Sequence, residues 1–575
     1  IEIDVITGAS AGAMTACILA QKLLFDGAAL RQPYDNALYH SWVEDVDIEK
    51  LLQFNQGENP NLAIFSSDLI AEIGKRYLLD RYASVTPTQS PHPASAKQIY
   101  LGLAMSNLNG VDYAVNLNNF MRLSKPDANE RPSFYKPNQV LTTSLNQLNF
   151  VYTRHKDCFI KRLSALDDHQ DIWQKIELIG RSSGAFPFAF RVLEVERKPN
   201  DPTNVDERAT YQGSVLSIVE NDLKSESDRV YKFAYTDGGV FENEPLGMAK
   251  NLVDKLDPGH RDYKNRFYLY VAPGAKGSTT NTKFTAEQAV FLETAKALTG
   301  AIFTQARFQD WIMTSQINQE LAQFQQQANR LKQVLQTEPA QQQNFDGVAD
   351  TLLHTLYHHT GNQSQTGVLD QTQDFERLKH QFAEDYSDLA QTDPQLANTW
   401  LKTIQILEKL QNLGPKDPMK VYTITSENVE LAGEELSAFG GFFDRKWRDY
   451  DYFIGRTKAI WLLENLQKMH QQGQGEAELY LTVTGSGQDL RHPDVDYGNV
   501  NLNNIRPEVR RAVRDRLLDR LSLIVDSFKT NFIIRALLKF SLWLFLAKYI
   551  DEEVLQLQKP SLMTRLKAWI ARLLK

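Results

Sequence analysis

The chain has 575 residues, of which 42 % are hydrophobic and 23 % are charged, and its formal net charge is −8. This composition excludes a disordered or fibrous protein and predicts a globular one with an ample core. The two cysteines, Cys17 and Cys158, are too few for a disulfide framework or a cysteine-based zinc cluster, and they fit a reducing compartment.

A strand, a tight turn and a helix are predicted at the start of the chain. The β-branched run that ends at Gly8 is typical of a strand, and a helical pattern begins at Ala11. Between them lies Gly-x-Ser-x-Gly with Ser10 at its centre, the sequence context of a nucleophile elbow. We expect Gly8 and Gly12 to remove Cβ atoms that would clash in this turn, and the helix to direct its first amides at Ser10. The alternative is an ordinary glycine-bounded turn with a capping serine.

Residues 25–273 are predicted to mix helices, loops and strands. The expected elements are a near-helical pattern over 42–52, a helix after the cap Ser66-Ser67-Asp68, a loop over 84–96, strands over 99–105 and 112–116 joined by an Asn109-Gly110 turn, a helix over 140–148, a turn over 180–187 that leads into another short helix, and strands over 213–219, 230–235 and 266–273.

Asp237 follows the strand predicted at 230–235 and is itself followed by Gly238 and Gly239. Alone, this Asp-Gly-Gly is explained by a β-turn in which glycine supplies a positive φ. Because ligands gather at the carboxyl ends of strands in open α/β sheets, Asp237 is also a candidate general base. A carboxylate can deprotonate Ser10 if it lies within hydrogen-bond reach and if partial burial raises its proton affinity. The backbone amide of Ala11 is then a candidate oxyanion donor.

Three motifs in this order resemble the patatin-like phospholipases. They are Gly8-Ala9-Ser10-Ala11-Gly12, then Arg181-Ser182-Ser183-Gly184-Ala185-Phe186-Pro187, and then Asp237-Gly238-Gly239 with Asn243 and Pro245. The resemblance covers roughly residues 1–275. It resumes at 421–425 and 439–445, and the next stretch, 447–452 with Gly455 and Arg456, is similar to a segment near the end of larger bacterial patatin-like proteins.

The resemblance implies a three-layer α/β/α core with a mainly parallel sheet. It also implies a lipid acyl hydrolase of the phospholipase A type, in which Ser10 and Asp237 form a catalytic dyad without a histidine and an acyl-serine is formed. Ser182, Ser183 and Pro187 would support the site as motif residues, and neither a metal nor a cofactor is expected. The glycine-rich oxyanion loop of the family belongs before the elbow, and because the chain opens inside a strand we expect further residues upstream.

Two alternatives remain open at this point. One is a Ser-His-Asp esterase of the α/β-hydrolase kind, for which the histidines after Asp237 are His260, His354, His358, His359, His380, His470 and His492. His260 lies in a polar turn, and the three histidines at 354–359 lack a carboxylate motif that would make a metal site. The other is a catalytically silent patatin-fold protein that binds membranes or acts as a scaffold.

Composition divides the chain into four predicted parts. They are an α/β catalytic core at 1–279, a glutamine-rich helical insertion at 280–415, a return to the core at 416–500 and a basic amphipathic helical region at 501–575. We expect the insertion to pack on the core, with a lid or a contact in a homo-oligomer as the other interpretations.

The C-terminal region is basic. Residues 506–575 hold 15 Lys and Arg against 7 Asp and Glu, a net charge of +8, so the rest of the chain carries −16. The apolar run over 532–546 contains Arg535 and Lys539 and falls short of the about 20 clean residues that a spanning helix needs. Basic helices that also carry Trp543 and Trp569 suit an anionic membrane surface, whereas the alternative is core helices with solvated charges. We expect a cytoplasmic, peripheral membrane protein with phospholipid as substrate and no nucleic-acid partner.

Overall fold

A computed structural model describes residues 1–114, 151–214, 230–257, 266–273, 339–360, 371–410, 419–426, 440–471 and 507–527, with short gaps at 54, 60–61, 84–88 and 202–203, and isolated positions elsewhere. The helix expected over 140–148 and most of the apolar run over 532–546 lie outside the described residues, as do His260 and His492.

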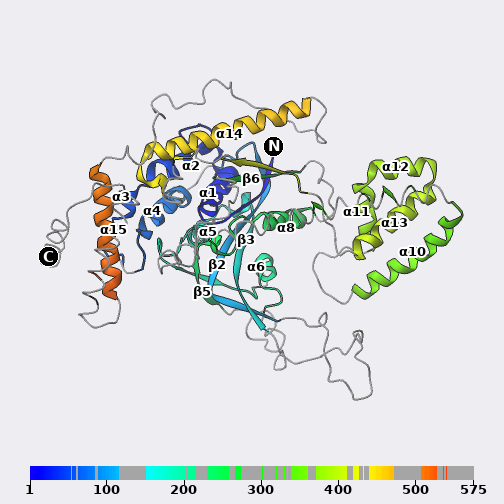
Figure 1. The fold of residues 1–575 in the computed structure, drawn as a ribbon, viewed down its shortest axis with the longest axis horizontal. Coiled ribbons are helices and arrows are strands. Elements are labelled where there is room, and N and C mark those ends of the chain that lie inside the picture. The colour runs from blue at the N-terminus through cyan, green and yellow to red at the C-terminus, as the bar shows by residue number, and fades with distance from the viewer. Residues whose placement is uncertain are drawn as a thin grey trace, which may run out of the picture.

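The α/β core is built on a five-stranded sheet (Figure 1). Its path is β1 (Ile3–Gly8), β2 (Ser95–Ala114), β5 (Tyr231–Thr236) and β4 (Leu193–Arg197), and β3 (Val151–Ser164) also pairs with β2. β1 and β2 run parallel, which the long helical crossover between them permits, and the other three pairings are antiparallel. The expected α/β class is confirmed. We expected a mainly parallel sheet, and the described sheet is mixed, with one parallel and three antiparallel pairings.

The sequence of β2 explains why helices cover both faces of the sheet. Ile99, Leu101, Leu103 and Met105 share a buried cluster with α1 (Ala11–Phe25) and α5 (Gln170–Ser183). Tyr100 and Ala104 belong to a second cluster with α8 (Leu246–Leu256). Successive side chains of a strand point to opposite faces, so a strand buried on both sides must be apolar at nearly every position. The run over 99–105 meets this requirement and produces three layers.

β2 is one long strand where the sequence predicted two strands and a hairpin turn. Its pairing with β3 shifts register between Ser106 and Val111, and Gly110 there has a φ of 72°. The side chain of Asn107 accepts hydrogen bonds from the backbone N–H groups of Asn109 (3.0 Å) and Gly110 (3.1 Å). The Asn-Gly pair therefore forms a bulge inside the strand instead of reversing the chain.

Three other local expectations are corrected. Residues 180–183 complete α5, and the turn starts only at Gly184, with no further helix before β4 among the described residues. At the described part of 213–219, Ser214 makes only an isolated bridge with Tyr113. The pattern over 42–52 forms two short pieces, the π-helix η2 (His40–Asp45) and α3 (Ile48–Leu51), because Asp47 caps α3 and interrupts the helix.

Other elements follow the sequence more closely. Helix α4 (Ser67–Leu78) starts at the expected cap, where Ser66 Oγ accepts a hydrogen bond from the Leu69 N–H (3.2 Å). The remaining short helices of the core are η1 (Gly27–Leu30), α2 (Ala37–Tyr39), η3 (Asp80–Ala83), η6 (Ala165–Asp167), α6 (Val205–Thr210) and η8 (Gly238–Val240).

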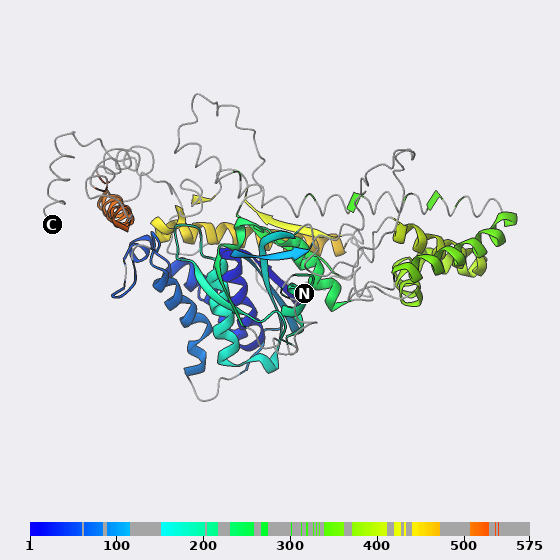
Figure 2. The ribbon, with the colours of Figure 1, turned by 90° about the horizontal axis from the view of Figure 1, so that it is seen from below.

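The chain leaves the core after β6 (Tyr268–Ala272) and returns with β7 (Val421–Thr425), which pairs with β6 in parallel. Between these strands lie the helices α10 (Pro339–Thr360), α11 (Gln371–Gln381), α12 (Ala383–Thr392) and α13 (Pro394–Leu410). The last three bury a core of their own around Trp400 and Leu401. Figures 1 and 2 show the four helices beside the α/β core. We expected the insertion to pack on the core, whereas in the described residues its helices pack on one another.

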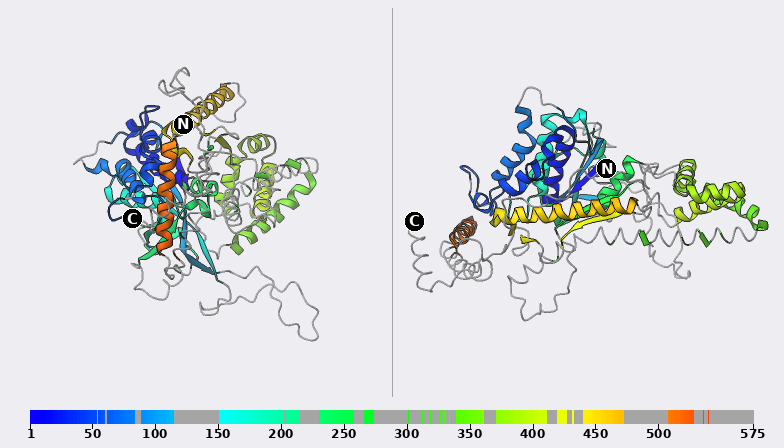
Figure 3. Two further views of the ribbon diagram at one scale, coloured as in Figure 1. Left: turned by 60° about the vertical axis from the view of Figure 1, so that its left-hand side comes forward. Right: turned by 90° about the horizontal axis from the view of Figure 1, so that it is seen from above.

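Two long helices complete the described structure. Figure 3 shows α14 (Arg445–Gln471) running along the core and α15 (Pro507–Ser527) at its edge. Val513 of α15 is buried in a cluster with Val46, Leu51 and Leu52, so this basic helix has an apolar side that packs on the core. Among the described residues, no helix combines the length and the hydropathy needed to cross a bilayer.

Candidate active site

Ser10 occupies the predicted turn between β1 and α1 with a φ of 54° and a ψ of −129°. A positive φ is strained for a residue with a side chain, and such strain collects at functional sites. A Cβ on Gly8 would lie 2.4 Å from the carbonyl oxygen of Gly12, so strand and helix approach this closely only because Gly8 has none. At Gly12 the expectation is wrong, because a Cβ there would meet nothing within 4 Å.

Asp237 lies at the end of β5 and faces Ser10, although 227 residues separate them. Ser10 Oγ donates a 2.6 Å hydrogen bond to Asp237 Oδ2, and the Gly239 N–H donates to Asp237 Oδ1 at 2.7 Å. Asp237 is 1 % exposed, and this burial raises the pKa of its carboxyl to about 6, against the opposing effect of the two hydrogen bonds. A carboxylate with this raised proton affinity can accept a proton from the hydroxyl that it already binds.

Close backbone packing fixes the Asp-Gly-Gly segment. The N–H of Asp237 donates to the Ala185 carbonyl oxygen (2.9 Å), and Ser106 Oγ donates to the Asp237 carbonyl oxygen (2.7 Å). A Cβ on Gly238 would lie 2.1 Å from the Ala104 carbonyl oxygen, and one on Gly239 would lie 2.7 Å from an oxygen of Asn243. Gly238 therefore lets the chain pass close to β2, and Gly239 leaves room for the side chain of Asn243, while the carboxyl group of Asp237 points at Ser10.

Ser183 connects the elbow to β2. Its hydroxyl donates to the Ala104 carbonyl oxygen (2.7 Å) and accepts a hydrogen bond from the Ser10 N–H (3.1 Å). The neighbouring Ser182 instead donates to the Leu178 carbonyl oxygen within its own helix (2.7 Å), and Pro187 lies in the turn after α5. Of the residues expected to support the motif in 181–187, Ser183 is the one hydrogen-bonded to Ser10.

The oxyanion donors expected from the sequence lie at the start of α1. The first amides of a helix have no acceptor within the helix, and the helix dipole adds partial positive charge there. Helix α1 begins at Ala11, directly after Ser10, so the N–H groups of Ala11 and Gly12 are in this position. The N–H of Ser10 itself is bound to Ser183, which leaves Ala11 as the first candidate.

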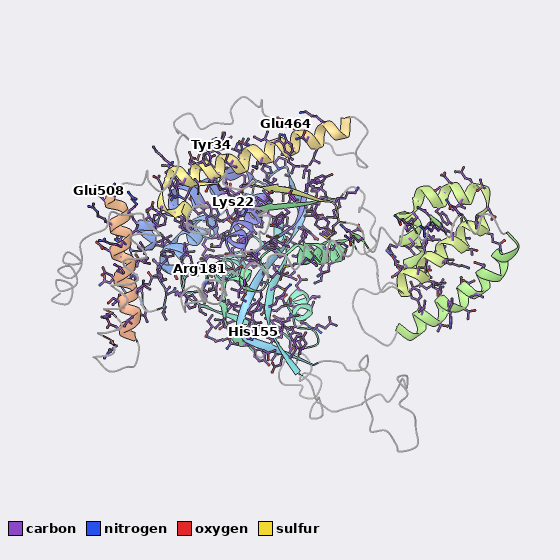
Figure 4. The ribbon with its side chains drawn as sticks, in the orientation of Figure 1. Lys22, Tyr34, His155, Arg181, Glu464 and Glu508 are labelled. Carbon is purple, nitrogen blue, oxygen red and sulfur yellow. The ribbon has the colours of Figure 1, made fainter. Side chains whose placement is uncertain are left out.

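An apolar cavity of about 130 Å³ opens at Ser10 between α1, α4 and α5. Its apolar lining is Met14, Ile18, Trp42, Val46, Ile70, Ile73, Leu78, Phe186, Phe190 and Phe442. Glu177 and Arg181 also line it and pair with each other through two hydrogen bonds (2.5 and 3.0 Å), so their charges are compensated (Figure 4 labels Arg181). Sequence reasoning missed this cavity because its wall comes from segments far apart in the chain, each with an ordinary apolar pattern.

The other chemical groups considered from the sequence form no described hydrogen bond with Ser10 or Asp237, although Cys17 lines the cavity. His354 and His380 are exposed on α10 and α11, and no histidine whose side chain the structure describes is hydrogen-bonded to Ser10 or Asp237. The same ranges contain no cluster of His, Cys, Asp and Glu suited to a metal ion. Cys17 and Cys158 are free, and burial raises the pKa of both thiols, that of Cys158 to about 11, which disfavours their reactive thiolates.

Comparisons with known proteins match two regions of the chain. The family model described as "Patatin-like phospholipase" matches residues 1–250, and the model described as "Protein of unknown function (DUF3376)" matches residues 390–474. Neither the curated proteins nor the solved structures gave a match. The first match contains Ser10, Ser183 and Asp237, so residues 1–250 of the chain are a patatin-like phospholipase domain, which is a lipid hydrolase domain.

Proposed function

We propose that this protein is a phospholipase A type lipid acyl hydrolase that uses Ser10 as nucleophile and Asp237 as general base. The observation that carries the proposal is the 2.6 Å hydrogen bond from a strained serine to a buried carboxylate at the opening of an apolar cavity. An acyl chain bound in the cavity would hold its ester carbonyl next to Ser10. The attack of the serine on the ester then becomes effectively unimolecular, because the two groups are already oriented.

In the first half of the reaction, Ser10 Oγ attacks the carbonyl carbon of the acyl ester while Asp237 Oδ2 takes the hydroxyl proton. The negative charge on the carbonyl oxygen is stabilised by the N–H groups at the start of α1, Ala11 first. The tetrahedral intermediate collapses when the bond to the alcohol oxygen breaks, and Asp237 returns its proton to this leaving group. The lysolipid departs and the acyl group stays on Ser10.

In the second half, water attacks the acyl-serine and Asp237 takes a proton from it. Collapse of the second intermediate restores the Ser10 hydroxyl with that proton and releases the fatty acid. The same carboxylate thus acts as base and then as acid in each half. A pKa of about 6 suits both roles, because the group ionises near neutral pH and still binds a proton transiently.

We further propose that the basic C-terminal region docks the enzyme on anionic phospholipid surfaces. The charge of +8 over 506–575, against −16 for the rest of the chain, favours an orientation with this region toward lipid head groups. In the described part of this region, α15 keeps Val513 in the core and Arg511 exposed to solvent.

The test is a lipid panel in which released fatty acid and lysolipid are measured by mass spectrometry. Ser10→Ala and Asp237→Asn should each lower the rate by on the order of 10⁴-fold or more, and the double variant should be no worse, because the two residues act as a unit. Ser182→Ala is the matched control and should keep its activity, since its hydroxyl bonds only within α5. A fluorophosphonate probe should label wild type at Ser10.

Each rival has its own result in this experiment. A histidine variant that matches the loss in Ser10→Ala, while Asp237→Asn retains activity, would replace the dyad by a triad. A folded protein that binds liposomes but releases no fatty acid and takes no fluorophosphonate would be the silent scaffold.

A further inference from the structure

Two segments about 400 positions apart in the sequence are hydrogen-bonded to each other. We call residues 440–452 the brace segment and residues 33–47 the wall segment. Tyr39 Oη donates to Asp449 Oδ1 (2.6 Å), and Arg448 Nε donates to the Val43 carbonyl oxygen (2.9 Å). Tyr452 Oη donates to the Pro33 carbonyl oxygen (2.7 Å). Three hydrogen bonds from residues 448–452 of the brace segment to residues 33–43 of the wall segment therefore fix the wall segment to the start of α14.

Arg448 joins the two segments at their centre. Besides Val43 it binds the carbonyl oxygens of Gly441 (3.1 Å) and Phe442 (3.2 Å), and it is buried to 7 % exposure. The planar guanidinium suits this role because it donates in several fixed directions at once. One side chain thus sets the position of Phe442 relative to Val43.

Aromatic packing reinforces the contact. The rings of Tyr39 and Tyr452 lie 5.0 Å apart and nearly perpendicular, and Tyr34 lies 5.8 Å from Tyr452. Figure 4 shows Tyr34 next to α14. The supported wall segment contains the π-helix η2, and single π-helical turns are rare and occur mostly at functional sites.

Both segments line the cavity at Ser10. The wall segment supplies Trp42 and Val46, and the brace segment supplies Phe442. The brace segment lies inside the match to the family model of unknown function, outside the patatin-like match. One residue of the wall of the cavity, Phe442, therefore comes from the region that matches the family model of unknown function.

We propose that the brace segment sets the acyl-chain specificity of this enzyme. Phe442 is the specificity-determining residue, and Arg448 is a positioning residue that holds Trp42 and Val46 in the cavity wall. The cavity measures about 130 Å³, close to the ~150 Å³ of apolar cavities that bind benzene, so one phenyl ring more or less changes its capacity greatly. This inference rests on the proposed function for its substrate class.

The first experiment measures kcat/KM of the full chain on p-nitrophenyl esters from butyryl to hexadecanoyl. Phe442→Ala should shift the preference toward longer acyl chains and Phe442→Trp toward shorter ones, each by on the order of tenfold in the long-to-short ratio. Phe443→Ala is the matched control, because Phe443 packs on the same apolar cluster but does not line the cavity. Its ratio should equal that of wild type.

The second experiment tests the positioning role. Arg448→Met should keep kcat/KM for the butyryl ester within about threefold and abolish the discrimination among long esters, a split that general destabilisation does not produce. If Arg448→Met fails to fold, the two Phe442 variants still decide the proposal.

A third measurement is independent of catalysis. Fatty acids of six to sixteen carbons displace dansylundecanoic acid from the Ser10→Ala protein, with and without Phe442→Ala. If wild type hydrolyses no ester but Phe442→Ala shifts this binding toward longer acids, the proposed function fails and the role of the brace segment stands. If neither Phe442 variant changes the ester profile and the binding profile is also unchanged, the inference is overturned.

Discussion

Burial of Asp237 suits its proposed role as general base and also destabilises the folded protein when its carboxyl is ionised. An exposed aspartate stays ionised well below neutral pH, whereas in this fold desolvation raises the pKa of Asp237 to about 6. Because the folded pKa lies above the unfolded one, the protonated form is favoured by folding. This stabilisation is complete below about pH 4 and is lost as the pH rises through about 6. The site is therefore least stable in the ionisation state that the proposed reaction needs, a common compromise at active sites.

The pH profile follows from this residue. kcat/KM on a soluble ester should be flat from about pH 7 to pH 9 and fall tenfold per pH unit below about 6, because protonated Asp237 cannot accept the Ser10 proton. Circular dichroism at pH 5 controls for unfolding. An acid limb near pH 4 would show that the carboxyl is not perturbed in the working enzyme, and the proposed role of its burial would be wrong.

At the scale of elements, a buried polar network ties the strand that carries Asp237 to its neighbours. Arg197 at the end of β4 donates to Glu207 of α6 (3.0 Å) and to the Cys158 carbonyl oxygen of β3 (2.8 Å). Asp157 of β3 accepts hydrogen bonds from Tyr211 (2.9 Å) and from Tyr235 of β5 (2.8 Å). Tyr235 is two residues before Asp237, so this network fixes the strand end at the site.

Breaking the network should cost much more than breaking an exposed ion pair. Arg197→Met removes the buried cation between Asp157 and Glu207, which leaves Glu207 only the more exposed Lys175, and should lower the free energy of unfolding by about 3–5 kcal/mol, measured by guanidinium titration. Lys232→Met is the control, because its pairs with Glu194 and Glu196 are exposed on the same sheet, and it should produce no measurable change. Equal effects of the two variants would show that the network contributes no more than surface charge.

At the scale of the whole molecule, opposite charges are separated along the chain. The acidic remainder carries the candidate site, and the basic region follows α14 at the C-terminal end. Helix α15 belongs partly to the core, since Val513 packs with Val46 and Leu51. The proposed lipid contact therefore has to be tested with α15 retained, because its removal would also disturb the cluster that contains Phe442.

Binding to anionic liposomes should weaken with added salt without vanishing. Each Lys or Arg near such a surface contributes on the order of 1 kcal/mol, screened within about 8 Å at physiological ionic strength. Apolar residues of the C-terminal run, such as Trp543 and Trp569, would supply the part that salt does not affect. A chain that ends after Ser527 should lose sedimentation with liposomes and keep its activity on a soluble ester. Equal liposome binding by the shortened chain would refute this docking role.

The sequence by itself determined the features that depend on neighbours in the chain. Glycines around a serine between a β-branched run and a helix predicted the elbow, and Asp-Gly-Gly after a strand predicted the candidate base. A nearly continuous apolar run predicted β2, although not that Asn109 and Gly110 would bulge inside it. Local sterics and side-chain alternation govern all of these, so a few residues suffice to reveal them.

Only the tertiary structure decided which distant residues meet. Several contacts join segments whose sequences show no common pattern. They are the hydrogen bond between Ser183 and Ser10, the polar network at Arg197 and the contact of Arg448 with Val43. A charged or apolar residue looks the same in sequence whether it faces solvent or a partner 400 positions away. The partner is selected by the free energy of folding. In the folded core each buried polar group needs a hydrogen-bond partner, and each apolar face needs another apolar surface to pack against.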